Sequence, residues 1–267
     1  MKSDERQGSH MKNVLSFKGK NAMVTGGSRG IGHAIALGLA SRGANVCISY
    51  SKSDGAAKET VESMSRYGVN AVSYKIDQNN IEEIPGLFRF AEKNIGDINI
   101  LVNNAGICPF KDFFEIDREL LESVWRVNFE SHFILTQLVS ERMIEDKIEG
   151  RILFISSISS RVGGEFQTHY TPTKSAINGL VHSLSIVLGK NRILVNSLEP
   201  GTILTDINRE DLSNRAKRKY MEKRVAIGRI GRPEDMVWPA LFLVSDENTY
   251  VTGTELLADG GMLVNLQ

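Results

Sequence analysis

The stretch NAMVTGGSRGIGHAIALGLAS, residues 21–41, joins a short apolar run to a helix-like pattern through a glycine-rich loop. Glycine permits a tight turn and lets the backbone approach a pyrophosphate group, which then lies at the positive end of the helix dipole. We therefore predict a strand at 21–25, a phosphate-binding loop at 25–32 and a helix at 31–41. The candidate cofactor-binding residues of this loop are Gly26, Ser28, Arg29, Gly30, Ile31 and Gly32.

Strand-like and helix-like segments alternate through the rest of the chain. Further strand-like runs occur at 45–49, 71–76, 98–102, 151–156, 193–198 and 254–257, and helical patterns at 55–67, 81–94, 118–144, 175–188 and 234–244. This alternation predicts an α/β fold, a single Rossmann-type doubly wound parallel sheet of about seven strands with helices on both faces. The runs are apolar throughout, which is typical of strands covered on both sides.

Two segments interrupt this regular order. The helical pattern at 118–144 is long for one helix, so we expect a bend or a break within it. The region 202–231 is rich in cations and has little strand character. It is either a solvated helical insertion or a mobile lid over the site, and we assign it as the substrate lid.

Composition limits the class of protein. The 267 residues are 41% apolar and 24% charged, which is typical of a globular protein with one sizeable core. Basic and acidic side chains number 32 each, so no overall field attracts nucleic acid or an anionic membrane surface. No apolar run suits a membrane span or a signal peptide. We expect one domain at 11–267 in the cytoplasm, preceded by an expression tag or a disordered leader at 1–10.

The two cysteines, Cys47 and Cys108, have no metal-ligand spacing to other residues. We predict reduced thiols, no disulfide and no metal site. Cys108 follows an NNAG run, so contact with substrate remains open, but we favour a small buried side chain.

The end of the second predicted strand indicates the type of cofactor. A carboxylate there binds the ribose diol of NAD and repels the 2′-phosphate of NADP. Here Tyr50 is followed by Ser51 and Lys52, and Arg29 of the glycine loop is a second cation. Charge complementarity therefore favours NADP, with NAD as the second choice. Asp77, after the third strand, is a candidate acceptor for the adenine amino group or a helix cap.

A tyrosine and a lysine at Tyr170 and Lys174 share one face of a predicted helix. An ammonium beside a phenol favours the phenolate, which lowers the tyrosine pKa toward the range useful for proton transfer. Ser157, at the end of the preceding strand, is placed to hydrogen-bond the same substrate oxygen. Pro172 fits only the first turn of a helix, so Tyr170 should stand at the helix start. By itself the pair is weak evidence, because such neighbours are common on solvated helices.

Together these motifs resemble the short-chain dehydrogenase/reductase family over residues 17–267. The chain has the family's TGxxxGxG at 25–32, its NNAG at 103–106, its helix asparagine at Asn128, its serine at Ser157, its YxxxK at Tyr170 and Lys174, and its PGxxxT at 200–205. The resemblance implies an oxidoreductase that transfers a hydride between substrate and a nicotinamide cofactor, with no metal.

The resemblance also implies a role for each matching residue. Tyr170 would be the general acid/base, and Ser157 would orient the reacting oxygen. Lys174 would lower the tyrosine pKa and hold the nicotinamide ribose, while Asn128 would hold a water that links Lys174 to solvent. The remaining implied cofactor contacts are Asn104, Ala105, Gly106, Pro200, Gly201, Ile203 and Thr205.

The stretches around this predicted site, at 104–110, 156–175, 199–208 and 250–261, look like the branch of the family that oxidises C1 of a neutral aldopyranose to the lactone, with L-rhamnose as the expected sugar. Neutral hydrogen-bonding groups suit a polyol, because an analogue without the hydroxyl leaves buried polar groups unpaired. The candidate substrate-binding residues are Ser157, Ser159, Gln167, Tyr170, Thr202 and Asn208. Another sugar dehydrogenase, a 3-oxoacyl reductase and a catalytically silent NADP-binding sensor remain as alternatives.

Two positions depart from the family pattern. Asn191 and Arg192 stand where glycine is common, and we expect the asparagine to adopt the left-handed conformation. Glu199 precedes the Pro-Gly pair, where neutral residues are usual, and we favour a paired buried acid over a carboxylate in the pocket.

The resemblance finally implies self-association. The family often pairs the helix containing Asn128 and the helix beginning at Tyr170 with their symmetry mates, so we expect a homotetramer. The apolar end at 261–267 is a candidate for a second interface.

Overall fold

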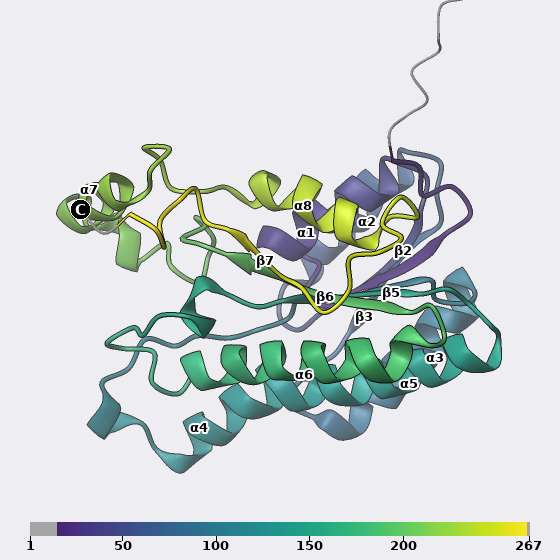
Figure 1. Cartoon of the computed structure of the whole chain (residues 1–267), viewed down its shortest axis with the longest axis horizontal. Helices are drawn as coiled ribbons and strands as arrows, with labels where there is room; N and C mark the ends of the chain where they lie inside the picture. Colours follow the sequence, from purple (N-terminus) through teal and green to yellow (C-terminus); the bar gives the residue numbers. More distant parts are fainter. Residues whose placement is uncertain (1–14, 266–267) are drawn as a thin grey trace, which may run out of the picture.

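The computed structural model describes residues 15–265 and contains a seven-stranded parallel sheet between two layers of helices (Figure 1). The predicted leader at 1–10 and the last two residues, 266–267, lie outside the described range. The strands are β1 (Asn21–Val24), β2 (Asn45–Tyr50), β3 (Ala71–Lys75), β4 (Ile100–Asn103), β5 (Arg151–Ile155), β6 (Leu194–Pro200) and β7 (Glu255–Ala258). The helices are α1 (Gly30–Ala40), α2 (Asp54–Ser65), α3 (Ile84–Ile95), α4 (Arg118–Trp125), α5 (Ser131–Glu145), α6 (Thr171–Gly189), α7 (Arg215–Arg224) and α8 (Val237–Val244). The predicted fold class is confirmed.

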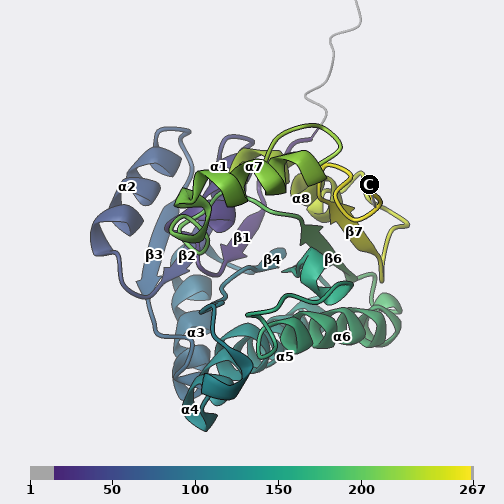
Figure 2. The same cartoon turned by 90° about the vertical axis from the view of Figure 1, so that its left-hand side faces the viewer.

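Each face of the sheet has its own apolar core. One contains Ile35 of α1 and Leu241 of α8, and the other contains Leu87 of α3 and Leu135 of α5. Figure 2 shows α1, α2 and α8 on one side of the strands and α3, α5 and α6 on the other. Strands β4 and β5 are buried at every residue, as their unbroken apolar sequences predicted.

The strand order β3-β2-β1-β4-β5-β6-β7 reverses direction at β1. From β1 the chain moves outward through β2 and β3, then returns to pair β4 with the other side of β1. Ligands of doubly wound folds bind beyond the carboxyl ends of the strands at such a reversal. The loops after β1 and β4 are therefore the first place to look for a cofactor.

The long helical pattern at 118–144 is broken, as predicted. A π-helical turn, Arg126–Glu130, separates α4 from α5, and Asn128 within it is fully buried. π-Helical turns are rare and often occur at functional sites. This one directs Asn128 into the protein between the two helices.

Helix α6 begins earlier than its apolar pattern indicated. Pro172 lies in its first turn, and Tyr170 is the residue that precedes the helix, as its sequence required. At the other end the prediction for Asn191 is wrong, because Arg192 has the left-handed conformation with φ 59°. The amides of Ile193 and Arg192 donate to the carbonyls of Leu188 and Gly189, the pairing of a Schellman motif, which puts Arg192 at the left-handed position.

The insertion 202–231 is closed at its base. Ile203 and Gly231 form a parallel bridge, and the amide of Gly231 donates to Thr202 O at 3.0 Å. Helix α7 inside the insertion buries no residue, and it lies at one end of the molecule in Figure 1. In residues 15–265 there is no helix both long and apolar enough for a membrane span.

Candidate active site

The loops after β1 and β4 are locked together by one threonine and one asparagine. The Thr25 hydroxyl accepts hydrogen bonds from the amides of Asn104 and Ala105 at 2.9 and 3.0 Å. In return the Asn104 side-chain amide donates to Thr25 O at 2.8 Å and to Gly26 O at 3.2 Å. The TG and NNAG motifs, far apart in sequence, therefore form one rigid edge of the crevice.

The glycine loop leaves room and hydrogen-bond donors for a phosphate group. A Cβ on Gly32 would lie 2.4 Å from Asn104 Nδ2 and 2.5 Å from Gly26 O, so no side chain fits there. Gly26 and Gly30 have φ of 64° and 59°, a conformation that favours glycine. Helix α1 has no side-chain cap at Arg29 and no acid in its first turn. Its free amide groups fit the pyrophosphate of a dinucleotide.

The end of β2 carries cations, but it also holds an acid that sequence reasoning missed. Asp54, the first residue of α2, accepts hydrogen bonds from Lys75 at 2.9 Å and from the Tyr50 hydroxyl at 3.0 Å. These bonds, with Lys75 the stronger influence, hold the pKa of Asp54 below its usual value. Asp54 follows Tyr50 by four residues, and that spacing is the signal that would have found it.

Among the described residues, Lys52 makes no ion pair, and Ser51 beside it is exposed. Arg29 instead pairs with Asp206 of the insertion at 3.3 Å. Asp77 is exposed and accepts the amide of Asn79 at 3.0 Å in a local turn. Asn80, rather than Asp77, precedes the helical turn that follows, so the interpretation of Asp77 as a helix cap is wrong.

The three predicted catalytic residues come together from β5 and α6. Ser157 follows β5, its hydroxyl accepts the amide of Ser159 at 3.0 Å, and it lies close enough to the Tyr170 hydroxyl to lower the pKa of that group. Lys174 is buried one turn into α6, with Nζ 5.6 Å from the centre of the Tyr170 ring. The Lys174 ammonium donates to Ile155 O at 2.8 Å.

The pKa of Tyr170 differs in direction from the sequence-based prediction. Burial raises this pKa above its usual value, Cys108 adds to the rise, and the nearby Ser157 hydroxyl opposes it. The expected lowering by Lys174 is not observed, since the pKa of this lysine is about 8 and it has already lost its charge when the phenol ionises. Burial also lowers the pKa of Lys174 to about 8, so this lysine exchanges protons close to neutral pH.

Asn128 supports the loop that follows β4. Its Oδ1 accepts the Ile107 amide at 2.8 Å, and its Nδ2 donates to Ile107 O at 3.0 Å and to the Thr173 hydroxyl at 3.3 Å. A Cβ on Gly106 would lie 3.4 Å from Asn128 Oδ1 and 3.8 Å from Lys174 Nζ. Asn128 therefore lies beside Lys174, and the predicted water link to solvent stays a prediction.

His132 is a residue of this site that sequence reasoning missed. It is buried one turn after Asn128, and burial followed by the positive charge of Lys174 lowers its pKa to about 3. The ring is therefore neutral, and its buried Nε2 has no hydrogen-bond partner among the described residues. The i, i+4 spacing from Asn128 is the signal that would have indicated it.

Two of the predicted substrate-binding residues belong to one polar chain. The Ser159 hydroxyl donates to Gln167 Oε1 at 3.3 Å, and Gln167 Nε2 donates to Cys108 Sγ at 3.4 Å. A Cβ on Gly164 would lie 2.3 Å from Gln167 Oε1, so this glycine makes space for the amide. Cys108 is buried, as predicted, and burial raises its pKa to about 11. Both Cys47 and Cys108 are free thiols.

The other two candidates have local partners. Asn208 accepts the amide of Thr205 at 3.0 Å and donates to Ile203 O at 2.9 Å, so its side chain holds the start of the insertion. The Thr202 hydroxyl lies 3.6 Å from Met262 Sδ. Just before them, β6 ends at Pro200, and a Cβ on Gly201 would lie 2.7 Å from Asp259 Cα. The PGxxxT segment thus leaves the sheet through a gap that admits only glycine.

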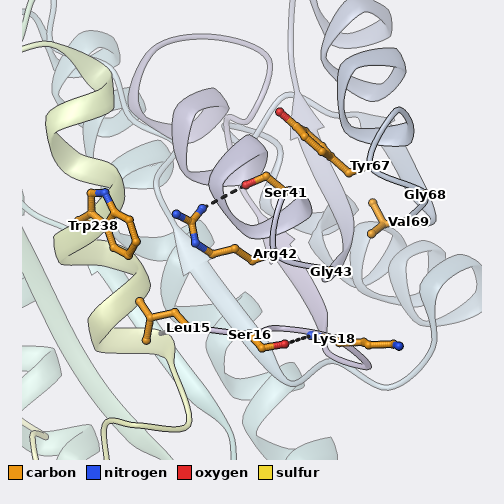
Figure 3. A pocket seen from close by; sticks show the side chains of 10 residues that line it. All are labelled: Leu15, Ser16, Lys18, Ser41, Arg42, Gly43, Tyr67, Gly68, Val69 and Trp238. Carbon is orange, nitrogen blue, oxygen red and sulfur yellow. Dashed lines mark hydrogen bonds between the residues drawn. The ribbon is translucent and has the colours of Figure 1, made fainter. Parts of the chain in front are cut away.

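A large surface cavity lies elsewhere (Figure 3). Its volume is about 610 Å³, and its lining includes Ser16, Gly43 and Val69, which precede β1, β2 and β3. It therefore opens at the amino ends of the strands. Arg42 stacks on Trp238 there, 4.4 Å from the ring centre, and donates to Gly38 O and Ser41 Oγ. The lining has no acid–base pair, so we place the chemistry at the carboxyl ends.

Comparison with known proteins agrees with this geometry. Residues 26–263 match the family model described as enoyl-(acyl carrier protein) reductase. The chain is 66% identical to a Thermoplasma acidophilum protein named L-rhamnose 1-dehydrogenase (NADP(+)), over 95% of this chain and 100% of the relative. A Sphingomonas protein named L-rhamnose 1-dehydrogenase (NAD(P)(+)) is 44% identical over 94% and 99%.

Among solved structures, a putative short-chain alcohol dehydrogenase from Sinorhizobium meliloti superimposes with a TM-score of 0.90. It is 30% identical, over 94% of this chain and 99% of that one. The sequence is thus similar over nearly its whole length to these relatives, and the fold to this solved structure. The chain belongs to the short-chain dehydrogenase/reductase family.

Proposed function

We propose that this protein oxidises the C1 hydroxyl of L-rhamnose, or of a similar neutral aldopyranose, to the lactone, with NADP as the hydride acceptor. One observation carries the proposal: the full-length relative that is 66% identical bears the name of this NADP-dependent activity. The intact Ser157, Tyr170 and Lys174 beside the glycine loop supply the required chemistry.

The reaction needs one proton acceptor and one hydride acceptor. NADP, when bound, supplies the nicotinamide carbon that receives the C1 hydride. Tyr170, as phenolate, removes the proton of the C1 hydroxyl while the C1–H bond breaks, and a C=O bond forms. Ser157 hydrogen-bonds the same oxygen and keeps it beside Tyr170. Since burial raises the pKa of Tyr170, the oxidation rate should increase toward alkaline pH.

The residues beyond the glycine loop fit a 2′-phosphate. Lys52 has no acidic partner among residues 15–265, and the nearby Asp54 is engaged by Lys75 and Tyr50. A phosphate would therefore meet Lys52 and Ser51 without a free carboxylate beside them, and at Arg29 it would compete with Asp206. NAD remains the second cofactor, as in the name of the Sphingomonas relative.

The polar chain through Ser159, Gln167 and Cys108 favours a sugar over a fatty acyl substrate. A 3-oxoacyl group calls for an apolar wall at this place, whereas amide and hydroxyl groups match the hydroxyls of a pyranose. A silent NADP sensor is less well supported, because it has no need of a matched Ser157, Tyr170 and Lys174.

We further propose a homotetramer of single-domain subunits. Among the described residues, α5 exposes Phe133 and Ile144, and α6 exposes Ile186 and Val187 to 80% and 57%. Exposed apolar side chains on neighbouring helices are typical of subunit interfaces. Sedimentation velocity should give one species of four chains, and a monomer at micromolar concentration would rule this out.

We also propose that residues 202–231 form a lid over substrate and that the protein works in the cytoplasm. The bridge between Ile203 and Gly231 at the base of the insertion makes it a closed unit able to move about its two ends. The two free thiols suit a reducing compartment.

The function is tested by NADPH formation, followed at 340 nm with a panel of aldoses. L-rhamnose should give the highest kcat/KM, and NADP should exceed NAD as acceptor. Turnover of a 3-oxoacyl thioester with NADPH but of no aldose would overturn the proposal, and NADPH binding without any turnover would favour the sensor.

A further inference from the structure

Glu199 is a fully buried acid that the proposed mechanism leaves unused. It has an exposed fraction of 0% and lies on β6 next to Pro200. Burial of a carboxylate is costly unless it is paired and hydrogen-bonded. The sequence favoured a paired acid at this position, and the structure confirms the pairing.

The two oxygens of Glu199 bind groups from two other elements. Oε1 accepts from Ser160 Oγ at 2.7 Å and from Asn178 Nδ2 at 2.6 Å, and Oε2 accepts from Arg161 Nε. Ser160 and Arg161 belong to the turn that follows Ser157. Asn178 lies one helical turn beyond Lys174 on α6. A single carboxylate thus contacts the serine turn and the tyrosine–lysine helix, and its own strand leads into the PGxxxT segment.

The Ser160 hydroxyl connects Glu199 to the catalytic Ser157. Ser160 Oγ lies 2.7 Å from Ser157 O as well as from Glu199 Oε1, so its single proton serves one acceptor at a time. The amides of Ser159 and Ser160 bond to Ser157 as well. Movement of Ser160 therefore moves the backbone that carries the Ser157 hydroxyl.

Arg161 balances the charge of Glu199 and connects it to the surface. Its Nη2 pairs with Glu255 at 3.0 Å, and the other oxygen of Glu255 lies 2.9 Å from His182 Nε2. Glu255 is partly exposed, at 22%, and within the serine turn it contacts Arg161 but not Ser160. The chain offers here a matched pair of acids: each binds Arg161 and one residue of α6, but only Glu199 bonds to Ser160 and to Asn178, which lie nearer to Ser157 and Lys174.

We propose that Glu199 is a positioning residue, which fixes the Ser157 turn against α6 so that Ser157 and Tyr170 meet at the substrate oxygen. This role rests on the proposed oxidation, since it acts through Ser157 and Tyr170 and touches neither substrate nor cofactor. Displacement of reacting groups by about 1 Å can lower a rate by roughly a hundredfold. The effect of losing Glu199 should therefore fall on kcat.

The variant Glu199→Gln tests this role, and Glu255→Gln is its matched control. An amide at 199 places an NH₂ donor against Arg161 or against the donors of Ser160 and Asn178. We expect kcat at saturating L-rhamnose to fall roughly 10- to 100-fold in Glu199→Gln, with the NADPH dissociation constant within twofold. For Glu255→Gln, kcat and the NADPH dissociation constant should both stay within twofold of the values of the unmodified protein.

The pH profile of kcat gives a readout that stability alone would not move. Displacement of the Ser157 hydroxyl from Tyr170 removes the influence that lowers this tyrosine's pKa. Cys108 and Lys174, two titratable groups near Tyr170, keep their own partners, Gln167 and Ile155, and the buried His169 next to Tyr170 is unchanged in both variants. The profile of Glu199→Gln should move to higher pH, and an unmoved profile with a lowered Tm would contradict positioning.

A double variant separates positioning from charge balance. Arg161→Leu/Glu199→Leu removes both charges, so it should recover Tm relative to Glu199→Leu while kcat stays low. Recovery of kcat together with Tm would overturn the proposal, because Glu199 would then serve only to balance Arg161.

Hydrogen exchange tests the proposal without any substrate. The amides of Ser159 and Ser160 should exchange faster in Glu199→Gln than in Glu255→Gln, since both bond to Ser157. Equal exchange in the two variants would refute the positioning role. If the unmodified protein does not oxidise L-rhamnose, the proposed function fails while this measurement still decides the role of Glu199.

Discussion

The cofactor edge and the substrate wall are built in different ways. At the cofactor edge, Thr25, Gly26 and Asn104 contact one another through backbone groups and short side chains within two motifs. At the substrate wall, Ser159 and Gln167 come from the connection between β5 and α6, Cys108 comes from the loop after β4, and the three meet through their side chains. A motif read from sequence predicts the first kind of contact well, because the backbone conformation it requires is local.

The catalytic tyrosine lies between the two regions, and its removal should have the largest effect. Tyr170→Phe should lower kcat about 10²- to 10⁴-fold, because no other group near the substrate oxygen is placed to accept the proton. NADPH binding, followed by fluorescence titration, should change less than twofold. A kcat within tenfold of the unmodified protein would show that the wall contains another base.

Lys174, on the same helix, should affect stability in a pH-dependent manner. Its pKa is about 8 when folded and near 10.5 when unfolded, so between these values the unfolded chain binds more protons and stability rises with pH. Below pH 8, burial of the ammonium lowers the free energy of unfolding by on the order of 3 kcal/mol. This cost decreases as the pH rises and is absent by pH 10.5.

Urea unfolding at pH 7.5 and pH 10 measures this dependence. The unmodified protein should gain free energy of unfolding relative to Lys174→Met between the two pH values. If the free energy of unfolding changed equally with pH in the two proteins, the Lys174 ammonium would be hydrated rather than buried.

A charge reversal at Lys52 tests the prediction for the cofactor edge. Lys52→Asp should reduce the preference for NADP over NAD roughly tenfold, because the new carboxylate repels a 2′-phosphate and binds a ribose diol. The ratio of kcat/KM for the two cofactors measures it. Lys58→Asp, on the exposed face of α2, is a matched control, and equal effects from both would show only a general dependence on charge.

The smallest expected effect concerns the ion pair between the glycine loop and the insertion 202–231. Arg29 pairs with Asp206, an exposed contact that a 2′-phosphate would compete with. Asp206→Asn should improve NADP affinity about two- to threefold, and leave NAD unchanged. The gain should vanish in the Arg29→Gln background. A weaker NADP affinity would indicate that Asp206 aids closure instead.

Much of the site was predictable because its residues act through local geometry. Gly32 is needed where a Cβ would meet Asn104, and Pro172 identifies the first turn of α6 and hence the place of Tyr170. Glu199 was predictable as a paired acid, but Arg161 as its partner was not, since the contact joins a loop to a strand many residues away. His132 and Asp54 each had a spacing signal in the sequence, but their burial and their partners on other elements, which give them their roles, were not visible there.

The direction of the Tyr170 pKa shows the same limit. The i, i+4 spacing correctly predicted that Lys174 lies near the tyrosine ring, but the ammonium donates to Ile155 O and burial controls the phenol. Desolvation depends on every neighbour of a group in space, and no sequence spacing contains that information.

By itself the sequence determined the family, the order of strands and helices, the glycine loop and the identities of Ser157, Tyr170 and Lys174, because these depend on local periodicity and short motifs. Only the tertiary structure decided the partner of Glu199, the neutral state of His132, the pKa direction at Tyr170 and the chain of contacts from Ser159 to Cys108. Each of these depends on burial or on a contact between distant segments, which exist only once the sheet and its two helical layers have packed.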